Sequence, residues 1–384
     1  MKVMLVSSSS GSRGGGELYL LYLGRALAKR AHEVTLWASS HPRMDELANS
    51  FSGIGGVIRA NYRNTYDRPG RSLASYLDSR LSARLAREWQ NACTSLVHLN
   101  KQNLEDGLDL LNALSRSRIP SLCTIHITQT AGYLKAVLAA LRDRVSRRAL
   151  RHYRGRIVTV LENRRRDLLR LIGPSSRVTT IPNGVPLYDL SRREKIRTLV
   201  RLELGIPANT KLFIGVGRMV PQKRPLLFLE QAERILAVVP EAQFLWVGDG
   251  PLAESWDDRV RRQGRVNVIH RLPWQADVQR LLLAADVFLH VAEFEGLPLA
   301  ILEAMSAGLP CAITSNLLEE MPFFDETNAL SIGPDNAWLA ALASPQRLGG
   351  VGRTARALIE TEFSYETMAE RYEALYEETL KACA

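Results

Sequence analysis

Cysteine, long apolar runs and clusters of metal-binding side chains are scarce in this sequence of 384 residues. Its four cysteines, at positions 93, 123, 311 and 383, lack the spacing of a metal or redox site and indicate reduced thiols in a cytoplasmic protein. No run approaches the ~18 apolar residues of a membrane-spanning helix. The apolar core of MKVMLVSSSS is too short for a secretory signal and predicts a first strand.

Several ligand-binding patterns are also missing. The glycines after this strand follow G-x-x-G-G-G and not G-x-G-x-x-G, which excludes a dinucleotide fingerprint. No cluster of histidine and carboxylate residues has ligand spacing, so we expect no bound metal. The most basic segment lacks interleaved aromatic residues for base stacking, so we expect no nucleic-acid partner.

The composition is that of a globular protein with two or three domains. Hydrophobic residues make up 46% and charged residues 23%, and the net charge of +10 suits anionic partners. Apolar strands alternate with amphipathic helices, which predicts an α/β fold. The polar segment PLYDLSRREK is the best boundary, giving a first domain of residues 1–187 and a second of 188–364.

The segment EFEGLPLAILEAMSAGLP, residues 293–310, follows an apolar strand and combines a turn with a helix. Pro298 suits the start of this helix, and Gly308 followed by Pro310 suits its end. The N-terminus of a helix at the carboxyl end of a strand is a site for phosphate. Glu295 and Glu303 span this terminus, where one carboxylate can hold sugar hydroxyls and the other a ribose. In isolation, Glu303 would more often be a solvated helix residue.

A second polar pair lies in KLFIGVGRMVPQKRP, where Arg218 and Lys223 flank a turn after a predicted strand. Two cations in this position could neutralise a diphosphate leaving group. Alternatively, they are ordinary surface charges.

Residues 284–314, AADVFLHVAEFEGLPLAILEAMSAGLPCAIT, resemble the E-x7-E signature of the retaining glycosyltransferases of family 4, with Glu295 and Glu303 at the signature positions. The resemblance implies the GT-B fold, in which two Rossmann-like domains face each other across a cleft. It also implies that the C-terminal helix, residues 365–384, crosses back to the first domain.

The resemblance assigns roles to individual residues. Arg218 and Lys223 match the family's G-R-x-x-x-x-K diphosphate motif, and Glu295 and His126 would face the donor sugar. These four residues are the candidate catalytic set. The remaining candidates for donor binding are Gly14 and Gly15 of a Gly-Gly-x-Glu segment, Arg271 and Leu272 near the base, and Gly296, Leu297, Pro298, Leu299 and Glu303. Taken alone, the glycines could simply form a flexible loop, and a lone histidine such as His126 is usually structural.

The implied activity is transfer of a sugar from a nucleoside diphosphate donor to a hydroxyl acceptor, with retention at the anomeric carbon. The expected donor is a UDP-sugar, with GDP-mannose second, and neither a cofactor nor a metal is expected. The acceptor is a carbohydrate, a lipid-linked molecule or a small molecule, as in glycan, glycolipid or glycoconjugate biosynthesis. Two alternatives remain, a nucleotide-sugar-binding protein without turnover and a nucleotide-sugar epimerase.

Residues 142–170 contain eleven arginines and only three acidic residues. They overlap an apolar stripe from Leu134 to Ala149 whose helical spacing predicts a helix over 134–151. One interpretation is a solvated helix face. The other is a surface for anionic lipid headgroups or a diphosphate-linked acceptor, which would place a cytoplasmic protein at the inner membrane face.

Overall fold

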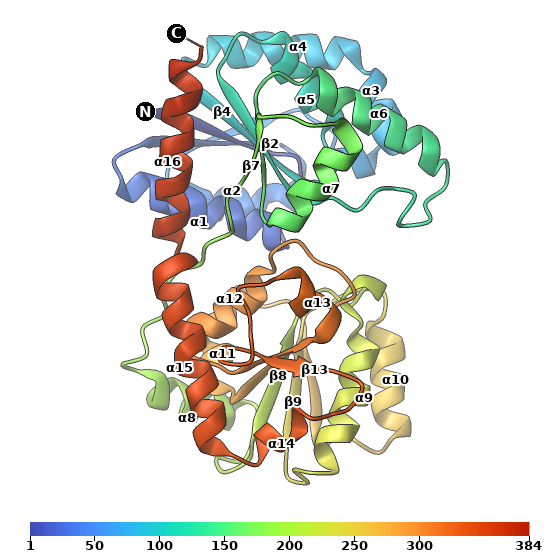
Figure 1. The fold of residues 1–384 in the computed structure, drawn as a ribbon, viewed down its shortest axis with the longest axis vertical. Coiled ribbons are helices and arrows are strands. Elements are labelled where there is room, and N and C mark those ends of the chain that lie inside the picture. The colour runs from blue at the N-terminus through green and yellow to red at the C-terminus, as the bar shows by residue number, and fades with distance from the viewer. Residues whose placement is uncertain (384) are drawn as a thin grey trace. The chain divides into compact units, whose positions relative to one another are not determined.

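The computed structural model describes residues 1–383, which form two compact units. Unit 1 comprises Met1–Gly184 and the C-terminal helix that begins at Tyr365, and unit 2 comprises Val185–Ser364. The sequence placed the first boundary between residues 187 and 188, whereas the structure has it between Gly184 and Val185. Each unit contains its own sheet (Figure 1).

Unit 1 is built on a seven-stranded parallel sheet in the order β3-β2-β1-β4-β5-β6-β7. Both faces of a parallel sheet are covered, so its strands are apolar runs such as KVMLVS. The strands are β1 (Lys2–Ser7), β2 (Glu33–Ser39), β3 (Gly56–Ala60), β4 (Leu96–Asn103), β5 (Ser121–Ile127), β6 (Arg156–Thr159) and β7 (Val178–Thr180).

Helices connect and cover these strands, together with the short 3-10 helices η1 (Pro42–Met44) and η2 (Thr65–Asp67). The helix predicted from Leu134 begins only at Ala139, because residues 132–135 form turns and Leu138 adopts a left-handed backbone with φ of 56°. The helices are α1 (Gly15–Lys29), α2 (Asp45–Ser52), α3 (Arg71–Leu77), α4 (Ser79–Asn91), α5 (Leu108–Arg116), α6 (Ala139–His152), α7 (Glu162–Ile172) and α16 (Tyr365–Lys381).

Helix α16 follows unit 2 in the sequence but packs beside α1 of unit 1, as the sequence predicted (Figure 1). Its buried Tyr372 and Tyr376 hydroxyls lie 2.8 Å from Thr124 Oγ1 and 2.7 Å from His98 Nδ1. Burial lowers the pKa of His98 to about 3, so this ring is neutral at physiological pH. The helix is thus held by satisfied buried polar groups as well as by apolar contact.

Unit 2 is built on a six-stranded parallel sheet in the order β10-β9-β8-β11-β12-β13. Its strands are β8 (Leu212–Val216), β9 (Gln243–Val247), β10 (Ile269–Leu272), β11 (Val287–His290), β12 (Cys311–Thr314) and β13 (Leu330–Ile332). Its helices are α8 (Arg193–Glu203), η3 (Pro221–Lys223), α9 (Pro225–Leu236), α10 (Ala253–Arg262), α11 (Val278–Ala284), α12 (Leu299–Ser306), α13 (Ser315–Glu320), α14 (Leu339–Leu342) and α15 (Pro345–Glu362).

Both sheets reverse their strand order at one position, β1/β4 in unit 1 and β8/β11 in unit 2. Open α/β sheets bind ligands at such switch points, beyond the carboxyl ends of the strands. The two sheets confirm the predicted α/β architecture of two Rossmann-like domains. Within residues 1–383 no helix is both long and apolar enough to cross a bilayer.

Candidate functional site

The loops that leave β8 and β11 are joined at the switch point of unit 2. The backbone N–H of Glu293 donates to the carbonyl of Gln222 at 2.8 Å, and the Gln222 side chain donates to the carbonyl of Phe294 at 2.9 Å. The first loop carries Lys223 and the second carries Glu295, so these bonds fix the two side chains relative to each other.

Glu295 is a buried carboxylate that forms an ion pair with Lys223. His290 Nε2, at the end of β11, lies 3.4 Å from the same carboxylate oxygen. Burial raises the pKa of Glu295, but Lys223 and His290 together outweigh it and lower the pKa to about 2. Glu295 is therefore a charged hydrogen-bond acceptor throughout the physiological pH range.

Arg218 lies at the carboxyl end of β8 with an exposed side chain. Its guanidinium makes no hydrogen bond or ion pair to any other residue within 1–383, so its donors are available to an anionic ligand. The turn after β9 supports its loop, because Met219 N–H donates to Asp249 carbonyl oxygen at 2.8 Å. A Cβ on Gly248 would lie 2.2 Å from the Gly217 carbonyl oxygen, so this close approach requires glycine.

Helix α12 begins at Leu299, directly after the loop that carries Glu295. Gly296, Leu297, Pro298 and Leu299 are buried, and Glu303 is buried on the helix itself. The helix ends where Gly308 takes the left-handed conformation with φ of 71°, as the sequence predicted. A buried carboxylate is costly unless it is compensated, which disfavours the interpretation of Glu303 as a solvated helix residue.

Arg271 and Leu272 end β10, two strands away from β8 at the edge of the sheet. Arg271 is held by Asp257 through two contacts of 3.0 and 2.7 Å, and its Nη1 lies 3.5 Å from Asp249. The carbonyl of Leu272 accepts the N–H of Gly248 at 3.0 Å. In this structure both residues therefore serve the local fold, and their predicted place near a base stays a prediction.

Gly14 and Gly15 follow β1 at the switch point of unit 1, and His126 lies near the end of β5, the strand next to β4. His126 Nε2 lies 2.7 Å from Asn100 Oδ1, and burial lowers the pKa of this histidine to about 4, so the ring is neutral at physiological pH. Asn100 in turn donates to the carbonyl of Gly16 at 3.0 Å, at the start of α1. This bond ties the glycine segment to the end of β4, which argues against a merely flexible loop.

Within residues 1–383 no group of three or more histidine, cysteine or acidic residues is arranged to hold a metal ion.

Comparison with protein families matches both units. Residues 13–188 match the family Glycosyltransferase Family 4, and residues 210–344 match Glycosyl transferases group 1. The chain therefore contains a family 4 glycosyltransferase domain followed by a group 1 glycosyltransferase domain.

Named relatives within these families act on different molecules. The UDP-Gal:alpha-D-GlcNAc-diphosphoundecaprenol alpha-1,3-galactosyltransferase of Escherichia coli is 39% identical over 144 residues, which are 36% of this chain and 37% of that enzyme. The chain aligns with about half the length of several other relatives. N-acetyl-alpha-D-glucosaminyl L-malate synthase of Bacillus anthracis is 23% identical over 99% of this chain and 98% of its own length.

Solved structures of glycosyltransferases share the fold of the whole chain. HepE of Anabaena, solved with UDP and glucose, superposes with a TM-score of 0.78 at 17% identity, over 98% of this chain and 100% of HepE. At this identity the likeness concerns the GT-B fold alone.

Each unit also has polar residues near its switch point that the sequence did not indicate. Gln102 donates to Ser9 Oγ at 2.9 Å and to Glu17 Oε1 at 3.1 Å, at the same edge as His126. His290 in unit 2 was also missed. Each lies at or near the carboxyl end of a buried strand, so the available signal was a polar residue at the end of an apolar run.

Proposed function

We propose that this chain is a retaining hexosyltransferase that transfers a sugar from a nucleoside diphosphate donor to a hydroxyl group. The observation that carries the proposal is the ion pair between Lys223 and the buried carboxylate Glu295 at the switch point of the second sheet, with the exposed cation Arg218 on the same loop as Lys223. A UDP-sugar is the preferred donor, ahead of GDP-mannose. The UDP-Gal named for the Escherichia coli relative, and the UDP and glucose bound to HepE, support this choice.

In the proposed reaction, the bond between the anomeric carbon and the diphosphate oxygen breaks, and negative charge develops on the departing diphosphate. Arg218 and Lys223 stabilise this charge. The acceptor oxygen forms the new bond on the same face of the sugar, and its proton passes to a diphosphate oxygen. The reaction as proposed needs no cofactor and no metal.

The remaining residues would position the donor. Glu295 holds sugar hydroxyls, Glu303 holds the ribose, and the segment Gly296–Leu299 lies along the phosphates at the start of α12. Arg271 and Leu272 are assigned to the base. In unit 1, Gly14 and Gly15 approach the donor, and the neutral ring of His126 offers a hydrogen bond to its sugar.

The acceptor is proposed to be lipid-linked. The lipid-linked sugar in the name of the Escherichia coli relative supports this class, whereas the L-malate in the name of the Bacillus anthracis relative favours a small molecule. Assays should therefore include both classes.

We further propose that the protein is cytoplasmic and contacts anionic membrane through residues 142–170. Six of the eleven arginines in this segment lie within ion-pair distance of carboxylates, namely Arg142, Arg156, Arg164, Arg165, Arg166 and Arg170. The other five make no ion pair with a carboxylate of residues 1–383, namely Arg144, Arg147, Arg148, Arg151 and Arg154, although Arg151 Nε donates to the carbonyl of Ile172 at 2.9 Å. Unpaired surface cations are the ones available to lipid phosphates.

Donor turnover tests the enzymatic proposal. Thermal shifts with UDP, GDP and ADP identify the nucleotide, and the matching nucleotide sugar is then incubated with and without acceptors. A transferase forms a glycoside only when acceptor is present, and proton NMR of the product shows whether the anomeric configuration is retained. Conversion of the donor to another sugar nucleotide without acceptor would instead identify an epimerase. Binding of the nucleotide sugar without any turnover would identify a nucleotide-sugar-binding protein.

Vesicle co-sedimentation tests the membrane contact. Charge reversal of two unpaired residues, Arg147→Glu with Arg148→Glu, should abolish binding to vesicles containing phosphatidylglycerol. The matched control reverses the paired residues Arg165 and Arg166, which already neutralise Glu162, and should weaken binding less. Binding should fall steeply with salt, because exposed charges are screened within ~10 Å at 0.1 M. Equal effects of the two double variants would contradict the special role of the unpaired arginines.

A further inference from the structure

The segment between β5 and α6 exposes a cluster of large apolar side chains. Its members and their exposed fractions are Tyr133 (59%), Leu134 (47%), Val137 (82%), Leu138 (63%) and Leu141 (46%). The sequence suggested that this stripe belongs to a helix with one apolar face. In the structure the helix starts later, and the apolar side chains of residues 133–141 face solvent while Ala149 and Leu150 supply the buried contacts of α6. We call residues 133–141 the apolar segment.

Hydrogen bonds hold this segment in a defined conformation. The carboxylate of Asp143 accepts the N–H groups of Ala131 at 2.7 Å and Gly132 at 3.0 Å. Arg142 forms a bidentate pair with Glu105, at 2.6 and 2.7 Å, and also donates to the carbonyl of Val137 at 3.3 Å. The backbone is therefore held just before this segment and at Val137, while the large apolar side chains are exposed.

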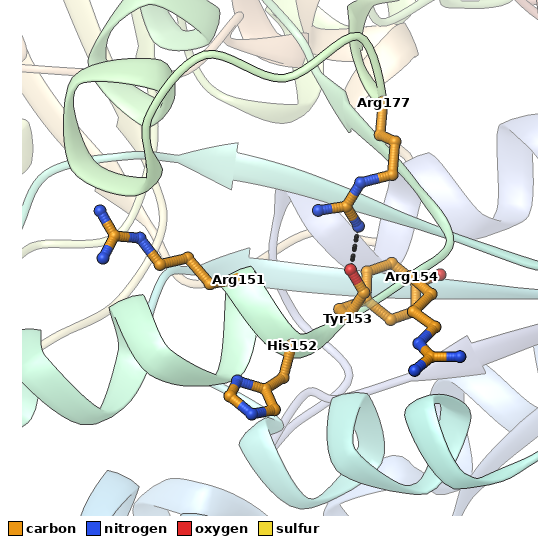
Figure 2. Close-up of a pocket in the computed structure, with 5 residues that line it drawn as sticks. All are labelled: Arg151, His152, Tyr153, Arg154 and Arg177. Atoms are coloured by element: carbon orange, nitrogen blue, oxygen red, sulfur yellow. Dashed lines mark hydrogen bonds between the residues drawn. The ribbon is translucent and has the colours of Figure 1, made fainter.

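The apolar segment continues into the unpaired arginines. Leu141, Arg144, Arg148 and Arg151 are exposed and follow one another at three- and four-residue steps, which places them on one face of α6. The row ends at a hollow of about 330 Å³ lined by Arg151, His152, Tyr153, Arg154 and Arg177 (Figure 2). Figure 2 shows Arg177 directed at the carbonyl of Tyr153, while Arg151 and Arg154 lie on either side.

An apolar patch beside a row of unpaired cations fits the boundary between lipid headgroups and acyl chains. A second copy of this chain fits less well, because two equally basic faces repel each other. Nucleic acid is bound by basic and stacking aromatic side chains, so it would not cover an exposed aliphatic cluster. An anionic bilayer satisfies the charge and the apolar area together.

We infer that the apolar segment inserts into the interfacial region of an anionic membrane while the exposed arginines of α6 bind lipid phosphates. The inference deepens the membrane contact proposed above and rests on it, but it is independent of the donor chemistry. The apolar segment follows β5, which carries His126 near its carboxyl end. Insertion would therefore bring this edge of the first sheet to the membrane surface, where a lipid-linked hydroxyl is presented.

The test uses the full chain and vesicles of phosphatidylcholine with or without 30% phosphatidylglycerol, a composition of the order needed for an anionic surface. Val137→Asp with Leu138→Asp should reduce partitioning onto anionic vesicles at least ~10-fold, since each change places a charge where acyl contact is expected. The matched control is Leu202→Asp, at a residue of α8 that is 79% exposed and far from this surface in the sequence, and it should bind as the unaltered chain does.

A direct readout of insertion completes the test. A polarity-sensitive fluorophore is attached to Val137→Cys in a chain whose exposed Cys93 and Cys383 are serine, with Leu202→Cys as the control site. Its emission should shift to the blue with anionic vesicles only at position 137. An unshifted emission, or unchanged binding of the double aspartate variant, would overturn the inference. The inference would also be overturned if the chain forms a dimer that the double aspartate variant dissociates while vesicle binding stays unchanged.

Failure of this inference can be distinguished from failure of the proposed function. A UDP thermal shift in every variant shows that unit 2 is intact. Loss of vesicle binding with UDP binding retained supports insertion, whereas failure of the unaltered chain to bind UDP or transfer sugar would refute the enzymatic proposal alone.

Discussion

Lys223 and Glu295, 72 residues apart in the sequence, form an ion pair at the switch point of the second sheet. Lys223 is assigned to the donor diphosphate and Glu295 to the donor sugar, so the two groups neutralise each other when no donor is bound. The Lys223 side chain is 19% exposed, so a diphosphate can reach its ammonium group. The pair thus presents a cation and an anion that a nucleotide sugar can both use.

Acid should weaken unit 2 through this pair. The pKa of Glu295 is lowered from 4.5 to about 2 in the folded protein, so its stabilising contribution is complete above pH 4.5 and is lost as the pH falls toward 2. The shift corresponds to a contribution on the order of 3 kcal/mol at neutral pH. Thermal unfolding at pH 2 to 7 should show a large difference between the unaltered chain and Glu295→Gln at pH 7. The difference should shrink toward zero near pH 2, because a protonated glutamate resembles glutamine. A difference independent of pH would contradict the assigned pKa.

Substitution of Gly15 distinguishes a structural role of the glycine segment from a role in donor binding. No atom lies within 4 Å of the position that a Cβ on Gly15 would occupy, and the residue opens α1. Gly15→Ala should therefore leave stability unchanged or raise it by about 0.5–1 kcal/mol, because alanine favours a helix. Transfer activity should nevertheless fall at least ~10-fold if a donor approaches the backbone here, and thermal unfolding and transfer are measured on the same sample. Full activity of Gly15→Ala would remove Gly15 from the site.

The sequence predicted the α/β fold and the helix whose end Gly308 marks, because apolar runs and glycine turns are local signals. It could not predict that Lys223 meets Glu295, since that contact depends on which strands become neighbours in the sheet. The same limit hid the bond between His126 and Asn100. The wrong start of α6 has a different cause: residues 134–138 have helical apolar spacing, but this spacing does not reveal that no core lies opposite them. Leu138 therefore adopts a left-handed turn at the surface.

Transfer should not depend on a divalent metal. Arg218 and Lys223 supply two positive charges where the diphosphate is proposed to leave, which is the role a metal ion has in other transferases. Activity measured in excess EDTA should remain close to the untreated value. Loss of activity that magnesium or manganese restores would refute the scheme in which protein cations stabilise the leaving group.

Glu295 and Glu303 should affect different kinetic parameters. Glu295 is assigned to the donor sugar, where charge develops at the anomeric carbon, so its loss should act on the transition state. Glu295→Gln should lower kcat at least ~100-fold, which corresponds to about 2.7 kcal/mol. Its affinity for UDP should be retained or increased, because Lys223 no longer has a competing carboxylate partner.

Glu303 is assigned to the ribose, a contact made equally in the bound donor and in the transition state. Uniform binding of this kind appears in KM and in the affinity for free UDP. Glu303→Gln should therefore weaken UDP binding by about 1–3 kcal/mol, the value of a hydrogen bond to a charged group, with kcat much less affected. Calorimetry with UDP on both variants distinguishes the two residues, and thermal unfolding controls for loss of the fold. If Glu295→Gln loses UDP while Glu303→Gln keeps it, the two assignments are reversed and the proposed orientation of the donor is wrong.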